Sequence, residues 1–177
     1  LLTLVLFLLY YTNKMSLFDS IAHSFTTIST GGFSTHNQSF AFFSNNILLI
    51  AILFMIIGSF PFLLIAQISF KKNFAIFRDN QIRVFLLILL FAISTIYIFA
   101  NQFLSGNQLD KLISVSFNTI SIISGTGFVS ENFENWGNYA SVLFLLLMFI
   151  GGCAGSTTGG LKVFRFQILF KYLFLHL

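Results

Sequence analysis

The sequence predicts an all-α integral membrane protein built from two helix–re-entrant loop–helix repeats. Of its 177 residues 56% are hydrophobic and 8% are charged, and the mean hydropathy is +0.91. A soluble domain typically carries about 25% charged residues. Two apolar runs, 47–66 and 84–100, approach the roughly 20 residues that a spanning helix needs. A polar, glycine-containing pattern also occurs twice between apolar segments, which indicates that one membrane unit is repeated.

The first repeat is expected to occupy residues 1–67. Its opening run, LLTLVLFLLYY, has about half the length needed to cross a bilayer. We therefore interpret it as a truncated first helix, and the chain as a piece of a longer protein. A loop over 19–33 and a second helix over about 44–67 should follow. Pro61 should kink that second helix, because proline cannot donate to the helical hydrogen-bond ladder.

A linker over 68–83 joins the repeats, and its charge indicates where it lies. It contains four basic residues, and three more lie near the C-terminus. Most acidic residues fall instead in the stretches 12–46 and 101–138. Loops rich in Lys and Arg face the cytoplasm. We therefore expect the linker and the C-terminal region to be cytoplasmic and the two more acidic stretches to be external.

The second repeat is expected over 84–177. Its first helix should run from 84 to 100, and its loop from 110 to 128. Its second helix, 139–177, should be broken by GGCAGSTTGG at 151–160, because glycine and hydroxyl residues form helices poorly. An alternative function for this glycine-rich segment is close helix packing through small residues.

The two loops follow one plan. LFDSIAHSFTTISTGGFSTHN at 17–37 parallels QLDKLISVSFNTISIISGTGFVSEN at 108–132. Asp19 and Asp110 lie 91 residues apart and Gly32 and Gly127 lie 95 apart, so the second copy has gained about one helical turn. The aspartates suit helix N-caps. A helix from Asp19 to about Ile28 would be ~15 Å long, too short to span, and a re-entrant hairpin accommodates it.

Backbone without helical hydrogen bonds is tolerated at membrane depth only where protein buries it or where it lines a water-filled path. The segments STGGF and SGTGF can therefore present carbonyl oxygens to a partly dehydrated cation. Glycine allows the positive φ that aims such carbonyls, and the negative end of each short helix would point to the same place. The plainer alternative is that both are ordinary extracellular loops.

Three segments carry a resemblance to a known family. TTISTGGFSTHN at 26–37, SIISGTGF at 121–128 and MFIGGCAGSTTGGLK at 148–162 resemble the Trk/Ktr superfamily of potassium-uptake proteins, in particular its bacterial TrkH-type membrane subunit. The resemblance covers essentially the whole chain. It implies potassium-channel-like helix–pore loop–helix repeats, four in one polypeptide around a single pore, of which this chain holds the second and the third.

The resemblance also implies site residues and partners. Potassium is the transported ion, held only by the backbone of a filter formed here by Ser29, Thr30, Gly31, Gly32, Ser124, Gly125, Thr126 and Gly127. An intramembrane loop in the third repeat is implied to gate the pore below the filter, through Gly151, Gly152, Gly155, Ser156, Thr157, Thr158, Gly159 and Gly160. The third filter segment usually reads Thr-Thr-Thr-Gly-Phe, so Gly125 departs from the pattern. Further implications are a homodimer, a cytosolic nucleotide-binding regulatory subunit, and a multi-pass location in the bacterial inner membrane.

Several other functions are disfavoured by the residues. GSTTGGLK resembles a phosphate-binding loop, but Leu161 stands where lysine is required, and Lys162 is expected to reach toward lipid headgroups. Cys153 and His23 are expected on opposite leaflets, so an intramembrane hydrolase lacks a nucleophile and base, and we expect no enzyme. We expect no cofactor in this chain, and the charge distribution gives no reason to expect a nucleic-acid partner. A non-conducting membrane remnant and a sodium-permeable relative remain as alternatives.

Overall fold

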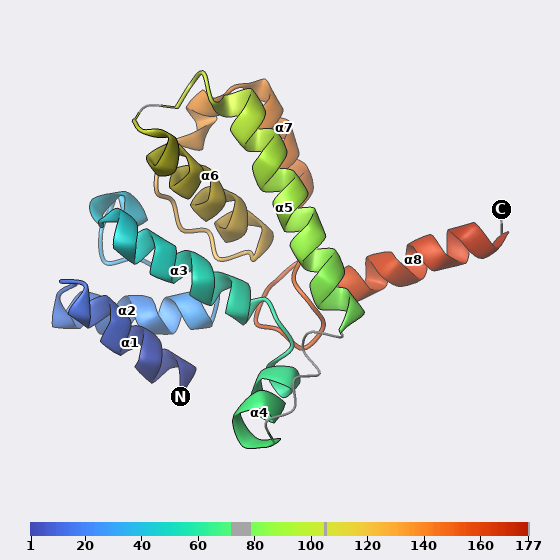
Figure 1. The fold of residues 1–177 in the computed structure, drawn as a ribbon, viewed down its shortest axis with the longest axis horizontal. Helices are drawn as coiled ribbons and strands as arrows, with labels where there is room; N and C mark the ends of the chain where they lie inside the picture. Colours follow the sequence, from blue (N-terminus) through green and yellow to red (C-terminus); the bar gives the residue numbers. More distant parts are fainter. Residues whose placement is uncertain (72–78, 105, 177) are drawn as a thin grey trace.

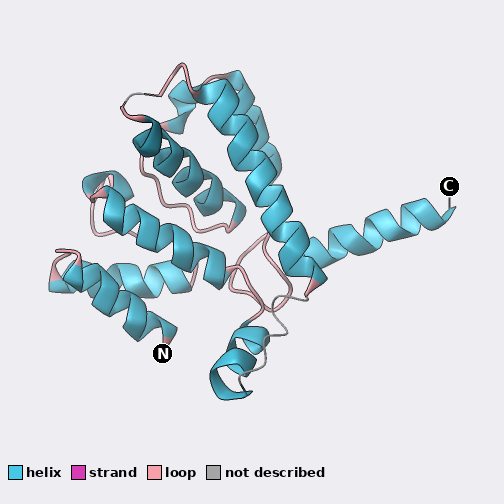
Figure 2. Ribbon diagram, viewed as in Figure 1, coloured by secondary structure: helices cyan, strands magenta, loops and turns pink. Residues whose placement is uncertain are grey.

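The computed structural model describes residues 1–71, 79–104 and 106–176, and within these ranges the regular structure is helical (Figures 1 and 2). The first part of the chain contains α1 (Leu2–Thr12), α2 (Leu17–Ile28), a short 3-10 helix η1 (Ser39–Phe42), α3 (Asn45–Gly58) and α4 (Phe62–Lys71). The second part contains α5 (Asn80–Ala100), α6 (Gln108–Ile123), a short 3-10 helix η3 (Phe133–Trp136), α7 (Asn138–Leu147) and α8 (Val163–His176).

The predicted repeat is present as two similar helix sets. In the first set α2 packs against α1 and α3, and in the second α6 packs against α5 and α7. The short helix α2 has 12 residues and α6 has 16, so the second copy is longer by about one turn, as the sequence predicts. The two sets meet where α6 packs against α3 (Figure 1).

The N-caps of α2 and α6 differ from the prediction. Ser16, and not Asp19, caps α2: its hydroxyl accepts a hydrogen bond from the Asp19 amide at 3.1 Å. Asn107 occupies the cap of α6, without a side-chain cap bond. Both aspartates lie instead in the first helical turn, where a carboxylate still interacts favourably with the positive end of the helix dipole. Asp110 also accepts a bond from Asn45 Nδ2 at 2.6 Å, which links α6 to α3.

The second helix of the first repeat is not continuous. The prediction of one helix over about 44–67 is wrong, because α3 and α4 are separate and meet at an angle of 104°. The bend falls at residues 59–61, where Pro61 has no amide proton to donate and its ring opposes a continuing helix. Proline therefore turns the expected kink into a break.

The linker is shorter than predicted at both ends. Residues 68–71 belong to α4, and α5 begins at Asn80 and not at 84, because the Asp79 side chain caps it by accepting from the amides of Gln81 and Ile82 at 2.8 and 3.2 Å. Residues 72–78 lie outside the described residues. Among the described helices α5 alone is long and apolar enough to cross a bilayer by itself, and α3 with α4 qualifies only as one bent span.

The predicted break in the last helix is present. α7 ends at Leu147, α8 begins at Val163, and residues 148–162 between them form an irregular loop, here called the intramembrane loop. In Figure 1 this loop lies at the centre of the molecule, between the ends of α3 and α5, while α8 projects away from the other helices. Residue 177 lies outside the described residues.

Candidate ion-conducting site

The first candidate filter segment begins where α2 ends. The Gly31 amide donates to the Thr26 carbonyl at 2.8 Å and the Thr30 amide to the Thr27 carbonyl at 3.2 Å, the bonding pattern of a Schellman motif. That motif needs one residue with positive φ, usually glycine, yet Thr30 occupies the position with φ of 51°. A β-branched residue there is strained. The Thr30 hydroxyl lies 2.7 Å from the Ser29 carbonyl oxygen and 3.0 Å from that of Thr157, and its single proton, shared between these two acceptors, partly offsets this strain.

The second filter segment ends α6 in the same way. The Thr126 amide donates to the Ser121 carbonyl at 2.9 Å and the Gly125 amide to the Ile122 carbonyl at 3.0 Å. Here glycine occupies the position of positive φ, with φ of 70°. Gly125 is thus the ordinary helix-ending residue, and Thr30 is the exception among the two copies. Both segments then continue through a glycine with positive φ, namely Gly32 at 71° and Gly127 at 84°.

The structure brings the two filter segments into direct contact. A Cβ atom added to Gly32 would lie 1.8 Å from the carbonyl oxygen of Thr126, so glycine is required both by φ and by space. Gly127 stands at the equivalent position of the second copy, and no atom of the described chain lies within 4 Å of its added Cβ. One side of the second filter segment is therefore open where the first is covered.

Aromatic packing holds the outer ends of the filter segments. Phe40, in η1, packs with tilted rings against Phe128, at a centroid distance of 4.3 Å, and against Phe117 of α6 at 5.2 Å. Beside it the Ala41 amide donates to the Val129 carbonyl at 3.2 Å. The connection that follows the first filter segment thus fixes the exit of the second. Phe40, Phe117 and Phe128 are buried where the two repeats meet.

A polar cluster at the start of α2 holds the exit of the first filter segment. Asp19 accepts hydrogen bonds from Thr35 Oγ1 at 2.6 Å and Ser16 Oγ at 2.7 Å, and His36 Nε2 lies 3.3 Å away. Burial acts to raise the pKa of Asp19, but the hydrogen bonds from these three side chains outweigh it and hold the pKa below its ordinary value. The carboxylate therefore stays ionised and anchors the outer loop. His23 is buried nearby, between the Asp19 carbonyl at 2.8 Å and Ser34 Oγ at 2.9 Å.

The intramembrane loop is a hairpin of irregular backbone. The Gly151 amide donates to the Leu161 carbonyl at 2.8 Å, and the Leu161 amide returns a bond to the Phe149 carbonyl at 3.0 Å. A Cβ on Gly151 would lie 2.1 Å from the Gly159 carbonyl oxygen, so only glycine lets the two sides of the hairpin approach this closely. Within it Thr158 Oγ1 accepts from the Gly152 amide at 2.9 Å.

Lys162 closes this hairpin, contrary to the expectation that it reaches toward headgroups. Its ammonium donates to the Thr158 carbonyl, to Thr158 Oγ1 at 3.0 Å and to Ser156 Oγ at 3.4 Å. A lysine has three protons to donate, and the hydroxyl-rich loop four to six residues earlier offers acceptors within reach of its side chain. The ammonium group of Lys162 is thus held by carbonyl and hydroxyl oxygens of the loop.

The intramembrane loop lies against the helix-proximal ends of both filter segments. Thr157 provides its carbonyl to Thr30 Oγ1, and its own hydroxyl lies 3.1 Å from the Ile28 carbonyl at the end of α2. A Cβ on Gly125 would lie 3.5 Å from the Gly159 amide nitrogen. The sequence-predicted filter and gate residues, distant in the chain, are therefore assembled into one place.

The loop also contacts residues that the sequence analysis did not assign to the site. At the break between α3 and α4, the Gly58 carbonyl accepts from Thr157 and the Ser59 carbonyl accepts from the Cys153 amide. On α5, Gln81 Oε1 accepts from the Ala154 amide at 3.0 Å. The sequence contained one relevant signal, GSFP at 58–61, because a proline-broken helix leaves carbonyls that need donors. For Gln81 we find no such signal.

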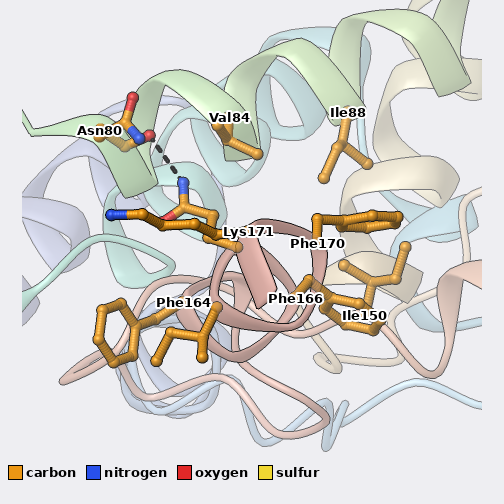
Figure 3. Close-up of a pocket in the computed structure, with 10 residues that line it drawn as sticks. Asn80, Val84, Ile88, Ile150, Phe164, Phe166, Phe170 and Lys171 are labelled. Carbon is orange, nitrogen blue, oxygen red and sulfur yellow. Dashed lines mark hydrogen bonds between the residues drawn. The ribbon is translucent and has the colours of Figure 1, made fainter. Parts of the chain in front are cut away.

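A groove of about 760 Å³ lies between α5 and α8 and is bordered on one side by Ile150 of the intramembrane loop. Figure 3 shows its lining of apolar side chains, among them Val84, Ile88 and Phe170, with Lys171 on its wall. The side-chain amide of Gln167, on α8, donates to the Asn80 carbonyl of α5 at 3.2 Å. Apart from such contacts the groove offers few polar groups, so it does not resemble an ion site.

Two short helices whose unwound ends touch, placed against a broken-helix loop, form an arrangement typical of ion-conducting membrane proteins. Comparison with known proteins specifies the family. The family model TrkH, described as a cation transport protein, matches residues 1–176, and the chain belongs to that family.

Relatives in this family share sequence and structure with the chain. It is 37% identical over 169 residues to the Trk system potassium uptake protein TrkI of Halomonas elongata, covering 94% of this chain and 34% of that protein. It is also 37% identical over 167 residues to TrkG of Escherichia coli K12, with coverage of 92% and 34%. The crystal structure of the potassium transporter TrkH from Vibrio parahaemolyticus matches with a TM-score of 0.89 and 34% identity, over 96% of this chain and 37% of that one. The chain thus spans about a third of the length of these relatives.

Proposed function

We propose that this chain forms two of four filter segments, and the gate, of a potassium-uptake pore. The eight residues at 29–32 and 124–127 supply the filter through their backbone, and the residues of 151–160 gate it. The names of the relatives support potassium as the transported ion, since TrkI, TrkG and TrkH are all potassium transport proteins. The membrane character follows from the family.

The observation that carries this proposal is an asymmetry between equivalent positions. Gly32 abuts the Thr126 carbonyl, whereas the equivalent Gly127 has open space beside it. Phe128 is 1% exposed beneath Phe40, whereas the equivalent Phe33 is 79% exposed. Each repeat therefore packs on the next in one direction, and the unfilled positions support further repeats that continue the ring. A carbonyl filter must surround an ion in this way to replace its hydration shell.

The chemistry of the site suits conduction rather than catalysis. Neither filter segment contains an ionisable side chain, so a cation would be held by peptide dipoles and hydroxyls without a carboxylate. Inward movement of one charge through 100 mV of membrane potential releases about 2.3 kcal/mol, which drives uptake without a nucleotide site in this chain. In this proposal no enzymatic activity is assigned, and K⁺ is cargo and not a cofactor.

The proposed setting is the bacterial inner membrane, with the chain crossing it several times. The proposed partners are lipid, the remaining pore repeats of the full-length protein, a second copy in a homodimer, and a cytosolic nucleotide-binding regulatory subunit. The linker and α8 carry the basic residues expected on the cytoplasmic side, and this charge supports the placement of such a subunit near them.

Ion uptake by the full-length protein in a bacterium deficient in potassium uptake tests the proposal. We expect growth at low potassium, and net K⁺ influx that collapses when the membrane potential is dissipated. Influx of Na⁺ equal to that of K⁺ would identify a sodium-permeable relative. If a protein shown to be folded in the membrane carries neither K⁺ nor Na⁺, the non-conducting alternative is supported.

A further inference from the structure

The break between α3 and α4 and the intramembrane loop exchange backbone hydrogen bonds. In a continuous helix the Phe62 amide would donate to the Gly58 carbonyl, four residues earlier. Here the Phe62 amide donates to the Gly155 carbonyl at 3.0 Å, and the Gly58 carbonyl accepts from the Thr157 amide at 3.3 Å and lies 3.1 Å from Thr157 Oγ1. One intrahelical bond is thus replaced by bonds to the loop.

A second carbonyl at the break is satisfied in the same way. The Ser59 carbonyl accepts from the Cys153 amide at 2.9 Å, and Ser59 and Cys153 are both fully buried. The loop fits closely here, since a Cβ on Gly152 would lie 2.8 Å from the Ser59 oxygen. Buried backbone groups that lose their partners are costly. The loop therefore cannot leave the break unless the break itself rearranges.

Thr157 connects this break to the filter. Its hydroxyl lies 3.1 Å from the carbonyl oxygens of both Ile28, at the end of α2, and Gly58. Its carbonyl lies 3.0 Å from the hydroxyl of Thr30, the residue of positive φ that ends α2. One residue of the loop thus contacts the filter segment and the break together.

We propose that Thr157 is a positioning residue that seats the gate in the α3–α4 break, and that gate opening is coupled to reorientation of α4. The inference rests on the proposed gating role of the loop. When the loop leaves, the Phe62 amide and the Gly58 carbonyl pair with each other, and the bend of 104° relaxes toward the smaller kink that Pro61 still imposes. The break thus has two bonding arrangements, and the loop is present in one of them. Because α4 leads into the basic linker, a force applied on that side reaches the gate through the break.

The lone cysteine of the chain reports the position of the loop. In the full-length protein in membranes, the rate at which N-ethylmaleimide modifies Cys153 is measured by mass spectrometry of the peptide that contains it. Thr157→Val removes the hydroxyl at nearly constant volume, and Thr157→Ser is the matched control that retains it. We expect Thr157→Val to react several-fold faster than the unmodified protein, up to about tenfold, the effect of losing one partly buried hydrogen bond. Thr157→Ser should react at close to the original rate.

A pair of variants on the other side of the contact keeps the test decisive if Thr157→Val fails to fold. A Cβ on Gly58 would lie 3.5 Å from Thr157 Oγ1, an ordinary contact, so Gly58→Ala should leave Cys153 protected. The larger side chain of Gly58→Val should displace Thr157 and expose Cys153. Equal modification rates in Gly58→Val and Gly58→Ala, or in Thr157→Val and Thr157→Ser, would overturn the proposed seat.

Coupling to α4 is measured separately, with spin labels at the exposed positions Leu53 of α3 and Leu63 of α4, in a background where the other cysteines are replaced. We expect the distance between the labels to increase in Thr157→Val as the bend relaxes. A reactive Cys153 with an unchanged label distance would overturn the coupling. Neither readout depends on ion flux, so the contact of the loop with the break is tested separately from its role as a gate. If displacement of the loop exposes Cys153 but leaves K⁺ flux unchanged, the proposed gating role is contradicted, whereas the contact between Thr157 and the α3–α4 break is not.

Discussion

Replacement of Gly32 by alanine tests the close contact between filter segments. The added Cβ would lie 1.8 Å from the Thr126 carbonyl oxygen and 2.9 Å from its carbon, and both are backbone atoms that cannot rotate away. The positive φ of 71° adds about 1–2 kcal/mol of strain for a residue with a Cβ. Overpacking adds typically about 1–3 kcal/mol. We therefore expect Gly32→Ala to cost about 2–5 kcal/mol locally and to displace the Thr126 carbonyl.

The assay is K⁺ and Na⁺ uptake by the full-length protein, with membrane insertion checked by expression and protease protection. Gly32→Ala should reduce K⁺ uptake or relax selectivity against Na⁺ without preventing insertion. Gly106→Ala is the matched control. Gly106 has a φ of +97°, but its added Cβ would make only ordinary contacts, at 3.5 Å and beyond, outside the filter. It therefore carries the φ strain alone.

Gly127→Ala extends the test to the ring. Among the described residues its Cβ meets nothing within 4 Å, so the φ strain accounts for a cost of about 1–2 kcal/mol there. If a further repeat packs on it as the second filter segment packs on Gly32, the variant should be as impaired as Gly32→Ala. Unchanged uptake and selectivity in Gly32→Ala would refute the reasoning, and normal behaviour of Gly127→Ala alone would refute the continued ring.

Three further predictions concern the topology of the linker, conduction by the isolated chain and the carboxylate of Asp19. A cysteine at Asn73, in the part of the linker outside the described residues, should resist an impermeant thiol reagent added to intact cells, because basic linkers are cytoplasmic; ready labelling would contradict that topology. The 177-residue chain alone should conduct no K⁺ in liposomes under an imposed voltage, since two filter segments form about half a ring; selective flux from a proven monomer would contradict this, whereas flux from a cross-linkable dimer would support a ring completed by a second copy. The lowered pKa of Asp19 stabilises the fold above the ordinary carboxyl pKa of about 3.9, and this contribution is lost as pH falls through the lowered value. The melting temperature of Asp19→Asn should therefore lie below that of the unmodified protein at pH 7, with a gap that narrows as pH falls below about 3.9; a gap that does not narrow at all on acidification would exclude the carboxylate as its cause.

The sequence by itself determined the class, the repeat and the candidate residues. Apolar composition and run length indicated a membrane protein, and the recurrence of Thr-Ile-Ser and Gly-Phe located both unwound segments. The break at 151–160 was also predictable, and Pro61 marked the place of a bend, although a kink and not a break was expected there, because proline and glycine act locally on the backbone. These features depend on near neighbours in the chain, which is why a single sequence contains them.

Only the tertiary structure decided how these parts bond to one another. The sequence predicted Asp19 as the cap of α2, but Ser16 takes that role and frees the carboxylate to bind Thr35 across the outer loop. Lys162 was expected to reach lipid, but it folds back onto Thr158 because the loop places acceptors beside it. The strained φ of Thr30 is tolerated through an oxygen of Thr157, 127 residues away. Such partners meet only when distant segments pack, so no local pattern of residue types specifies them.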